Sequence, residues 1–298
     1  MSEYLMRSLM FVPAHNAKLM DSAIRTPADV LLFDIEDSVQ PVANKQVARD
    51  MVVKYMQEGK FAGRNVFPRI NDRESGQLLK DVTQLTIPGI AGFMYPKAKR
   101  GEDIYFFDKL LETIEYEKGI EIGTYKIIPL IETASAVLNV QEICQASKRV
   151  VAIAYGSEDF IADLEGIHDE EHVSLFTPRA IIAMGARAHN IIPIDTVHVR
   201  VKDLEDLEKN LVLSRKLGFE GMMILNPMEL ELAHRYYSPS PEEVEHSNEI
   251  LRLDQEAREN GVGVAIMNGK FVGPPFVIKA KKILKLHESI TRIEGKTP

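Results

Sequence analysis

Tryptophan is absent from this chain of 298 residues, and cysteine occurs only once, as Cys144. A single cysteine excludes an internal disulfide and any metal site built from several thiolates, and we expect Cys144 to lie on the core side of a helix. No apolar run approaches the roughly 18 residues that a transmembrane helix needs, and the first residues show no signal-like pattern. We therefore expect a soluble, cytoplasmic protein without membrane contact.

An excess of positive charge is also missing. The chain has 36 Lys and Arg residues against 44 Asp and Glu residues, which gives a formal net charge of −8. Binding to a nucleic-acid backbone needs a basic stripe, and none is visible, so we expect no nucleic-acid partner. An anionic small-molecule substrate would have to be bound by a few placed cations or by a metal ion.

Several common catalytic motifs are missing as well. The sequence contains no G-x-x-x-x-G-K-[ST], no G-x-G-x-x-G and no G-x-S-x-G pattern. Nucleotide hydrolysis, Rossmann-type dinucleotide binding and serine hydrolase chemistry therefore lose their usual sequence support.

What the chain does have is a series of eight apolar, β-rich segments with helical periodicity between them. They span residues 8–13, 30–37, 66–71, 92–97, 127–133, 151–159, 195–201 and 221–227. This alternation predicts a closed barrel of parallel strands with outer helices, an α/β fold of the (β/α)8 TIM-barrel class. The length and the 45% hydrophobic composition suffice for one such barrel with a short appendage.

The end of the eighth segment suggests a division of the chain into two parts. We assign residues 1–237 to the catalytic barrel and residues 238–298 to a C-terminal extension. Ser240 and Glu243 form the sequence pattern of a capping box, which predicts that a new helix starts there.

The rest of this extension is expected to contain strand-like stretches around Asn268 and then a basic helix over residues 277–287. Because the extension follows a complete barrel, it should pack against the barrel mouth or against a neighbouring subunit. Segments of that kind often act as lids.

Charged residues stand where several of the apolar segments stop. They are Glu36, Asp37, Arg69, Lys97, Glu132 and Asp159. In a (β/α)8 barrel the carboxyl ends of all strands meet at one mouth, so these side chains are expected to face a single pocket. Their convergence predicts an active site.

Glu132 and Asp159 are the candidates for a metal site. Mg²⁺ typically takes one or two carboxylates and completes its coordination with water and substrate oxygens, and Mn²⁺ is a possible substitute. An acid at the end of a strand can instead cap the following helix. Thr133 or Ser135 would be a better cap than Glu132, whereas Ser157 competes with Asp159 for that role.

Glu36 and Asp37 could hold the water ligands of the cation or act as proton acceptors. The alternative is that Asp37 caps the following segment and Glu36 pairs with an arginine. Arg69 offers a planar fork for a carboxylate or an enolate oxygen, or it forms a structural ion pair with the surrounding acids.

Lys97 suggests a Schiff-base aldolase, but such a lysine needs a lowered pKa, and crowded acids raise the pKa of a lysine. We therefore interpret Lys97 as an electrostatic partner of the carboxylates. His15 lies just beyond the first segment and is a possible mouth residue, whereas His198 is expected inside the seventh strand as a barrel histidine.

The blocks SLMFVPAHNAKLM, DVLLFDIEDSV, PLIETASAVLN and YGSEDFIADL give the chain a family resemblance. It resembles the citrate lyase β-subunit-like branch of the HpcH/HpaI aldolase family, with the malyl-CoA and citramalyl-CoA lyases. The resemblance implies Mg²⁺ at Glu132 and Asp159 and substrate contacts at Arg69 and Glu132. It also implies that Lys18 lies near the phosphate of an acyl-CoA or acyl carrier, and that the protein is a homo-oligomer, a trimer or a hexamer.

The chain departs from the family pattern at functional positions. A G-K-x-x-I-H-P block of many members is replaced here by residues 221–227, without the lysine and the histidine, at Met222 and Asn226. An aspartate that family members contribute from a neighbouring subunit's lid is replaced by Gly273. Proton transfer would then fall to Glu36 or to a water organised by Asp37.

We expect a Mg²⁺-dependent carbon–carbon lyase acting on a 2-hydroxy acid or a hydroxyacyl thioester such as citryl-, malyl- or citramalyl-CoA. One alternative is a catalytically reduced subunit of a lyase assembly, or a binding protein for a keto acid or an acyl-CoA. Another is a different Mg²⁺ barrel enzyme acting on pyruvate or phosphoenolpyruvate.

Overall fold

A computed structural model describes residues 4–167, 173–261, 265–267 and 270–295 of the chain. It divides into two compact units, Met1–Ala233 and His234–Pro298. The assignment of residues 1–237 to a catalytic barrel and of residues 238–298 to an extension stays a prediction. No helix in these described ranges is both long and apolar enough to cross a membrane.

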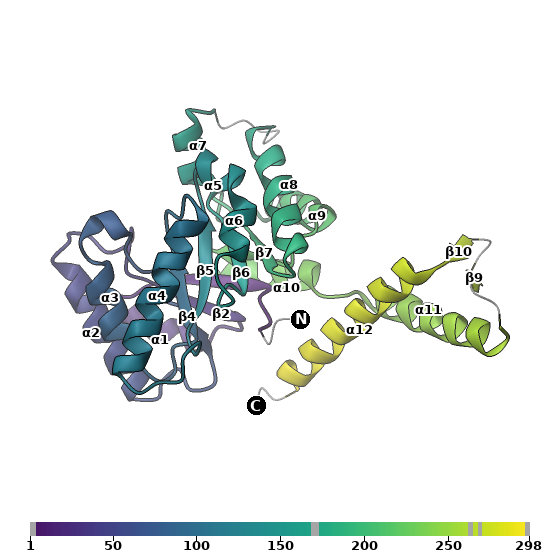
Figure 1. Cartoon of the computed structure of the whole chain (residues 1–298), viewed down its shortest axis with the longest axis horizontal. Helices are drawn as coiled ribbons and strands as arrows, with labels where there is room; N and C mark the ends of the chain where they lie inside the picture. Colours follow the sequence, from purple (N-terminus) through teal and green to yellow (C-terminus); the bar gives the residue numbers. More distant parts are fainter. Residues whose placement is uncertain (1–3, 168–172, 262–264, 268–269, 296–298) are drawn as a thin grey trace. The chain divides into compact units, whose positions relative to one another are not determined.

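The first unit is a (β/α)8 barrel, as predicted from the sequence (Figure 1). Its strands are β1 (Ser8–Pro13), β2 (Val30–Asp34), β3 (Asn65–Val66), β4 (Gly92–Tyr95), β5 (Lys126–Ile131), β6 (Ala152–Tyr155), β7 (Ile192–Asp195) and β8 (Gly221–Ile224). Parallel pairing runs through the order β3-β2-β1-β8-β7-β6-β5-β4. Parallel bridges from Val66 to Ile90 and from Arg69 to Met94 connect the β3 and β4 segments, so the sheet returns to its start.

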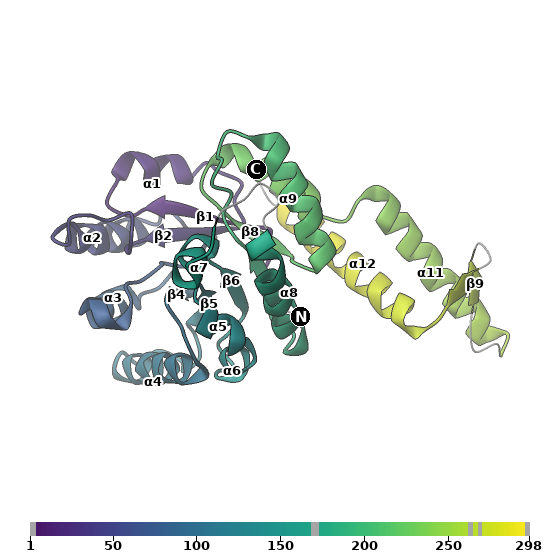
Figure 2. The same ribbon diagram turned by 90° about the horizontal axis from the view of Figure 1, so that it is seen from above.

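Helices surround these strands, as Figure 2 shows from above. They are α1 (Ala17–Ala23), α2 (Asn44–Gln57), α3 (Leu78–Leu85), α4 (Gly101–Glu117), α5 (Ala134–Leu138), α6 (Val140–Gln145), α7 (Ser157–Leu164), α8 (Val173–Ala188) and α9 (Leu204–Leu217). Strand residues such as Leu9, Leu32 and Ile128 form a buried apolar cluster within the barrel. Cys144 is buried on α6, as expected.

The predicted seventh strand was placed too late in the chain. The structure has β7 at Ile192–Asp195 and a loop over residues 196–203. A barrel strand is covered on both faces, so its sequence is a continuous apolar run. Residues 196–201 alternate between apolar and polar side chains instead, which is the pattern of a strand with one solvated face. His198 therefore lies in this loop and not in a strand, with its Nε2 atom 3.1 Å from the Asp203 carbonyl oxygen.

Several other predicted strands extend past their observed ends. β2 ends at Asp34, so Glu36 and Asp37 belong to the turn that follows. β6 ends at Tyr155, and Asp159 lies in the first turn of α7. β3 has only two residues, because Pro68 offers no N–H group to a strand ladder.

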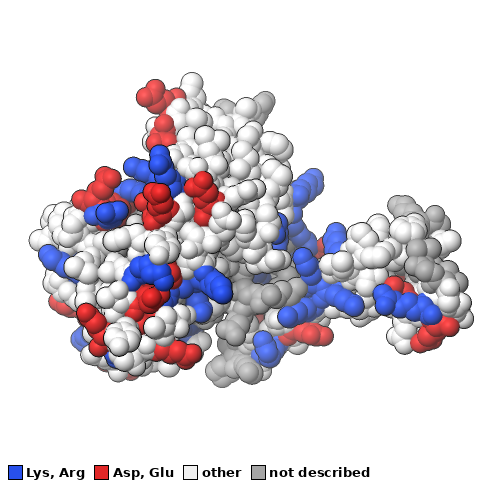
Figure 3. All heavy atoms as spheres, in the orientation of Figure 1, with Lys and Arg blue, Asp and Glu red and all other residues white. Residues whose placement is uncertain are grey.

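The second unit contains α11 (Pro241–Glu259) and α12 (Pro274–Glu294), joined through β9 (Ala265–Met267) and β10 (Lys270–Val272). The predicted capping box is confirmed, since the Ser240 hydroxyl accepts from the Glu243 backbone N–H at 3.2 Å and the Glu243 carboxylate accepts in return. Asn268 lies outside the described residues. Basic side chains are visible along α12 in Figure 3.

The last helix starts earlier than predicted and also ends later. Gly273 is its N-cap and Pro274 its first residue, because proline suits the first helical turn, where the missing N–H has no partner to lose. Val277 packs with Ile250 and Val272 in a small apolar core of this unit.

Two short elements, η2 (Pro227–Glu229) and α10 (Leu230–Tyr237), follow β8. Glu229 is fully buried there, with one carboxylate oxygen accepting from the Leu225 backbone N–H at 3.2 Å. Its other oxygen, Oε1, has no hydrogen-bond partner within the described chain. Burial raises the pKa of Glu229 to about 7.

Because this pKa lies above the usual value of 4.5, the unfolded chain releases the proton first as the pH rises. We expect Glu229 to lower the free energy of unfolding progressively between about pH 4.5 and pH 7, by on the order of 3 kcal/mol in all. Glu229→Gln should remove this loss. Urea unfolding at pH 5 and pH 8 measures it, with the exposed Glu231→Gln as control. Equal pH dependence in wild type and Glu229→Gln would contradict the expectation.

Candidate active site

A cavity of about 480 Å³ lies at the carboxyl ends of the barrel strands. Its charged lining residues are Asp34, Asp37, Arg69, Glu132, Glu158 and Asp159. Four of the six predicted mouth residues, Asp37, Arg69, Glu132 and Asp159, therefore share one cavity. Glu36 and Lys97 are not lining residues, but Glu36 contacts Arg69 of this lining and Lys97 contacts Glu36.

Arg69 is held mainly by Asp34, a residue that the sequence analysis missed. Nε and Nη2 of Arg69 donate to the two Asp34 carboxylate oxygens, each at 2.8 Å. Asp34 also accepts from the backbone N–H groups of Glu36 and Ser38, both at 3.0 Å. Burial opposes ionisation of Asp34, but Arg69 and these donors outweigh it and lower the pKa of the carboxyl. Its position in the sequence could have identified Asp34 as a mouth residue, because it is the first acid after the apolar run of residues 30–33.

Glu36 and Asp37 both contact the same guanidinium. Nη1 of Arg69 lies 3.2 Å from Glu36 Oε2 and 3.1 Å from Asp37 Oδ2. The Glu36 side chain is buried, whereas that of Asp37 is 62% exposed. Burial is the main cause that raises the pKa of Glu36 to about 7, with Arg69 acting in the opposite direction. The ion pair of Glu36 with an arginine is thus observed, whereas its role as a proton acceptor stays a prediction.

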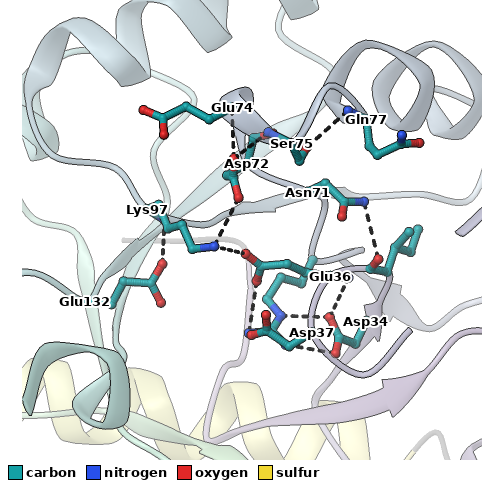
Figure 4. A network of polar contacts seen from close by, with 12 residues as sticks. Asp34, Glu36, Asp37, Asn71, Asp72, Glu74, Ser75, Gln77, Lys97 and Glu132 are labelled. Carbon is teal, nitrogen blue, oxygen red and sulfur yellow. Dashed lines mark hydrogen bonds and ion pairs between the residues drawn. The ribbon is translucent and has the colours of Figure 1, made fainter. Parts of the chain in front are cut away.

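Lys97 lies between two carboxylates, as Figure 4 shows. Its Nζ atom is 3.0 Å from Asp72 and 3.3 Å from Glu36. Burial works against the charged ammonium, but the hydrogen bond to Asp72 and the charge of Glu36 outweigh it and raise the pKa of Lys97. This is the opposite of what a Schiff-base lysine requires, and it agrees with the role of electrostatic partner.

Glu132 is positioned by two backbone features. Lys97 adopts a left-handed conformation, with φ of 53°, and its backbone N–H donates to Glu132 Oε1 at 2.6 Å. Gly156 lies so close that a Cβ atom there would come within 2.9 Å of the Glu132 Cβ. Thr133 caps α5 through its side chain, so Glu132 is not needed as a cap.

The electrostatics of Glu132 suit a bound cation. Its carboxyl is buried, and burial, followed by the negative charges of Glu36 and Asp159, raises its pKa to about 8. A divalent cation between Glu132 and Asp159 would supply the missing positive charge. No cluster of three or more His, Cys, Asp or Glu ligands occurs among the described residues. Two carboxylates with open positions for water and substrate are the donor set that Mg²⁺ uses.

A buried network of hydrogen bonds holds the turn that carries Glu36 and Asp37. The Lys45 ammonium donates to the carbonyl oxygens of Ile35 and Glu36, at 3.2 and 3.0 Å, and to the Asn71 side chain. Asn71 in turn donates to Asp81. Lys45 therefore fixes the turn that carries the acid pair, and nothing in the local sequence of α2 distinguishes it from a surface lysine.

The other predicted positions do not line the cavity. Lys18 is exposed on α1 and does not line the cavity. His15 has a buried Nδ1 atom without a hydrogen-bond partner in the described chain. At the positions of the family's lysine and histidine, Met222 is buried in β8, and the Asn226 side chain accepts from the Met228 backbone N–H at 3.0 Å.

Comparison with known proteins identifies the family of this chain. Residues 7–227 match the family model described as HpcH/HpaI aldolase/citrate lyase. The chain belongs to this family. Among members of the HpcH/HpaI aldolase/citrate lyase family, the citrate lyase subunit beta of Leuconostoc mesenteroides is 31% identical over 96% of this chain and 94% of its own length. That of Haemophilus influenzae is 31% identical over 97% and 99% of the two chains.

Solved structures show the same fold. A citrate lyase from Burkholderia xenovorans superposes with a TM-score of 0.84 at 20% identity, covering 98% of this chain and 93% of that one. The CitE protein of Mycobacterium tuberculosis, in complex with magnesium, acetoacetate and coenzyme A, superposes with a TM-score of 0.72 at 23% identity, covering 94% and 97%.

Proposed function

We propose that this protein is a Mg²⁺-dependent carbon–carbon lyase that cleaves a 2-hydroxy acid thioester into a 2-oxo acid and an acyl thioester. The observation that carries the proposal is the excess of carboxylates around one arginine in the barrel cavity, with Glu132 buried at a raised pKa. The relatives named citrate lyase subunit beta support this class of reaction. The CitE protein crystallised with magnesium supports the choice of cation.

In this proposal Glu132 and Asp159 hold the cation. When bound there, Mg²⁺ would supply a Lewis acid for the negative charge that develops on the substrate oxygens. Arg69 provides the charge and hydrogen bonds for the enolate oxygen of the leaving acyl thioester, where negative charge grows in the transition state. Asp34 keeps the guanidinium plane oriented through its two bonds to Nε and Nη2.

Glu36 is the proposed proton acceptor. Its pKa of about 7 lets it accept the hydroxyl proton near neutral pH and return it to the enolate carbon afterwards. Glu36 does not line the cavity of this structure, so the transfer passes along Asp37 or a water molecule at the exposed rim. The contacts with Arg69 and Lys97 hold Glu36 in place for this role.

A product assay tests the proposed reaction and separates it from a neighbouring one. Relatives from Cereibacter sphaeroides, 26% identical over 95% of this chain, are named (3S)-malyl-CoA thioesterase. Incubation of malyl-, citramalyl- and citryl-CoA with the protein and Mg²⁺ should release a 2-oxo acid while the thioester bond survives in acetyl-CoA. Release of free thiol without a 2-oxo acid would assign the thioesterase reaction. No reaction with any of these thioesters would contradict both.

Arg69→Lys tests the arginine fork. Lysine keeps the charge but cannot make the two parallel bonds to Asp34, so the contact with enolate or carboxylate should weaken by about 1.5–3 kcal/mol. We expect kcat/KM to fall by roughly ten- to a hundredfold at an unchanged affinity for Mg²⁺. Steady-state kinetics and calorimetry measure the two quantities. Wild-type turnover in Arg69→Lys would show that the fork is not used.

A further inference from the structure

The two candidate metal ligands come from separate segments of the barrel. Glu132 directly follows β5, two residues before α5 begins its chain of backbone bonds at Ala134, whereas Asp159 lies in the first turn of α7. Helices α5 and α7 contact each other at this end of the barrel (Figure 1). The geometry offered to a cation therefore depends on how firmly α7 is held to the turn that carries Glu132.

The buried side of α7 attaches it to the barrel near β7. Ser157, Phe160 and Ile161 are its buried residues, and the other residues of this short helix are exposed. The Ser157 backbone N–H donates to the Thr196 hydroxyl oxygen at 3.2 Å, and that hydroxyl donates to the Ser157 hydroxyl oxygen at 2.6 Å. These bonds hold the start of α7 to the segment that follows β7, which is the side away from Glu132.

Asp163 supplies a link on the side of Glu132. Its Oδ2 atom accepts from the Ala134 backbone N–H at 2.7 Å. This N–H belongs to the first turn of α5, where the helix itself offers no acceptor. Asp163 follows Asp159 by four residues, so the two side chains lie on the same face of α7. One carboxylate thus joins the helix that carries Asp159 to the turn that carries Glu132.

A fixed separation of two carboxylates matters more to Mg²⁺ than to Ca²⁺. Mg²⁺ needs nearly ideal octahedral geometry, with oxygen ligands at about 2.0–2.1 Å. Ca²⁺ accepts a flexible set of six to eight oxygens at about 2.3–2.6 Å. Loosening of α7 against the β5–α5 turn should therefore weaken the binding of Mg²⁺ more than the binding of Ca²⁺.

We propose that Asp163 is a positioning residue that makes the metal site selective for Mg²⁺ by holding α7 to the β5–α5 turn. This inference rests on the metal site of the proposed function and adds the origin of its selectivity. Asp163 does not line the cavity, so it acts through the placement of Asp159 and Glu132 and not by contact with the cation or the substrate.

Asp163→Ala removes the link and leaves both proposed ligands in the chain. We expect the Mg²⁺ affinity to fall by roughly tenfold, at the lower end of the loss that is typical when a residue supporting a metal ligand is removed. The Ca²⁺ affinity should fall by less than about threefold, because Ca²⁺ tolerates the looser geometry. Calorimetric titration of the metal-free full chain with MgCl₂ and with CaCl₂ measures both quantities. Equal losses for the two ions, or no loss of Mg²⁺ affinity, would overturn the inference.

Asp163→Asn separates the hydrogen bond from the negative charge. Asparagine keeps a side-chain oxygen that can accept from the Ala134 N–H, but it is neutral. The ratio of Mg²⁺ to Ca²⁺ affinity should therefore stay close to that of the wild type. If Asp163→Asn lost as much Mg²⁺ affinity as Asp163→Ala, the residue would act through its charge and the positioning role would be wrong.

Asp203→Ala is the matched control. The Asp203 carboxylate accepts from the Asp206 backbone N–H at 3.0 Å at the start of α9, and Asp203 is exposed and does not line the cavity. The variant loses a bond of the same kind, so it measures the general effect of freeing a helix start. We expect an unchanged ratio of Mg²⁺ to Ca²⁺ affinity. The same loss of Mg²⁺ preference in Asp203→Ala would contradict the assignment to Asp163.

The metal titration and the thioester assay keep the two proposals separable. If the wild type cleaves a thioester and Asp163→Ala keeps the wild-type ratio of Mg²⁺ to Ca²⁺ affinity, the lyase function stands and the positioning role fails. If no thioester is cleaved while Mg²⁺ binding depends on Glu132, Asp159 and Asp163 as described, the lyase function fails and the positioning role survives.

Discussion

Glu132→Gln is expected to weaken Mg²⁺ binding by roughly a hundredfold or more and to abolish lyase turnover. Loss of a supporting residue around a metal already costs about 10- to 100-fold in affinity, and Glu132 is one of only two proposed protein ligands. In the metal-free protein, the same substitution should raise the free energy of unfolding at pH 8. Because the pKa of Glu132 is raised from 4.5 to about 8, its ionisation opposes folding as the pH rises through that range, and glutamine removes this effect.

The combination of weaker metal binding with higher stability at pH 8 separates a lost ligand from a damaged fold. Titration calorimetry with Mg²⁺ and urea unfolding in EDTA measure the two effects. Asp159→Asn should weaken binding as strongly, whereas Glu142→Gln on α6, an exposed residue outside the cavity, should leave both quantities unchanged. Wild-type Mg²⁺ affinity in the Glu132→Gln/Asp159→Asn double variant would exclude the proposed metal site.

Asp34→Asn is expected to be the most destabilising single change in the charged group. The side chains of Asp34 and Arg69 are 3% and 11% exposed, so removing one charge leaves its partner buried with weaker compensation. Such a loss typically costs about 3–5 kcal/mol, and contacts of Arg69 with Glu36 and Asp37 place the expected value near the lower end. Turnover should fall as well, because the Arg69 guanidinium loses the two hydrogen bonds that orient it.

An exposed ion pair supplies the matched control for this prediction. Arg187 and Glu220 form a contact with side chains that are 42% and 39% exposed, and Glu220→Gln should cost at most about 1 kcal/mol. Denaturant unfolding of both variants gives the comparison. Asp34→Asn combined with Arg69→Gln should lose less than the sum of the two single variants, since the second change removes the charge that the first left unpaired. Strict additivity would mean that the two residues are not coupled.

The predicted barrel depended on features that are local in the chain. Continuous apolar strands such as β2 and β8, separated by helical periodicity, allow few other arrangements, and the pattern at Ser240 and Glu243 marks a helix start by itself. The prediction failed at β7, where an alternating loop segment looked more like a strand than the short run Ile192–Asp195. Alternation of apolar and polar side chains indicates a strand with one solvated face, and a strand of this barrel has no solvated face.

The candidate site shows the same division between local and spatial information. The acids and Arg69 could be placed at one mouth from the sequence, because parallel strands bring their carboxyl ends together. The sequence did not allow us to predict which acid pairs with Arg69. Asp34 and Arg69 are 35 positions apart, and whether this arginine pairs with Asp34 or another acid depends on distances that no local pattern contains.

The sequence by itself therefore determined the barrel, the set of charged residues at its mouth and the resemblance to the HpcH/HpaI aldolase/citrate lyase family. Only the tertiary structure decided that Lys45 fixes the acidic turn, that Gly156 makes room for Glu132, and that apolar side chains from β1, β5 and β8 meet beside the acids. The physical reason is range. Periodicity and capping act over a few neighbouring residues, whereas burial, close approach and charge pairing arise between segments that become neighbours only when the barrel closes.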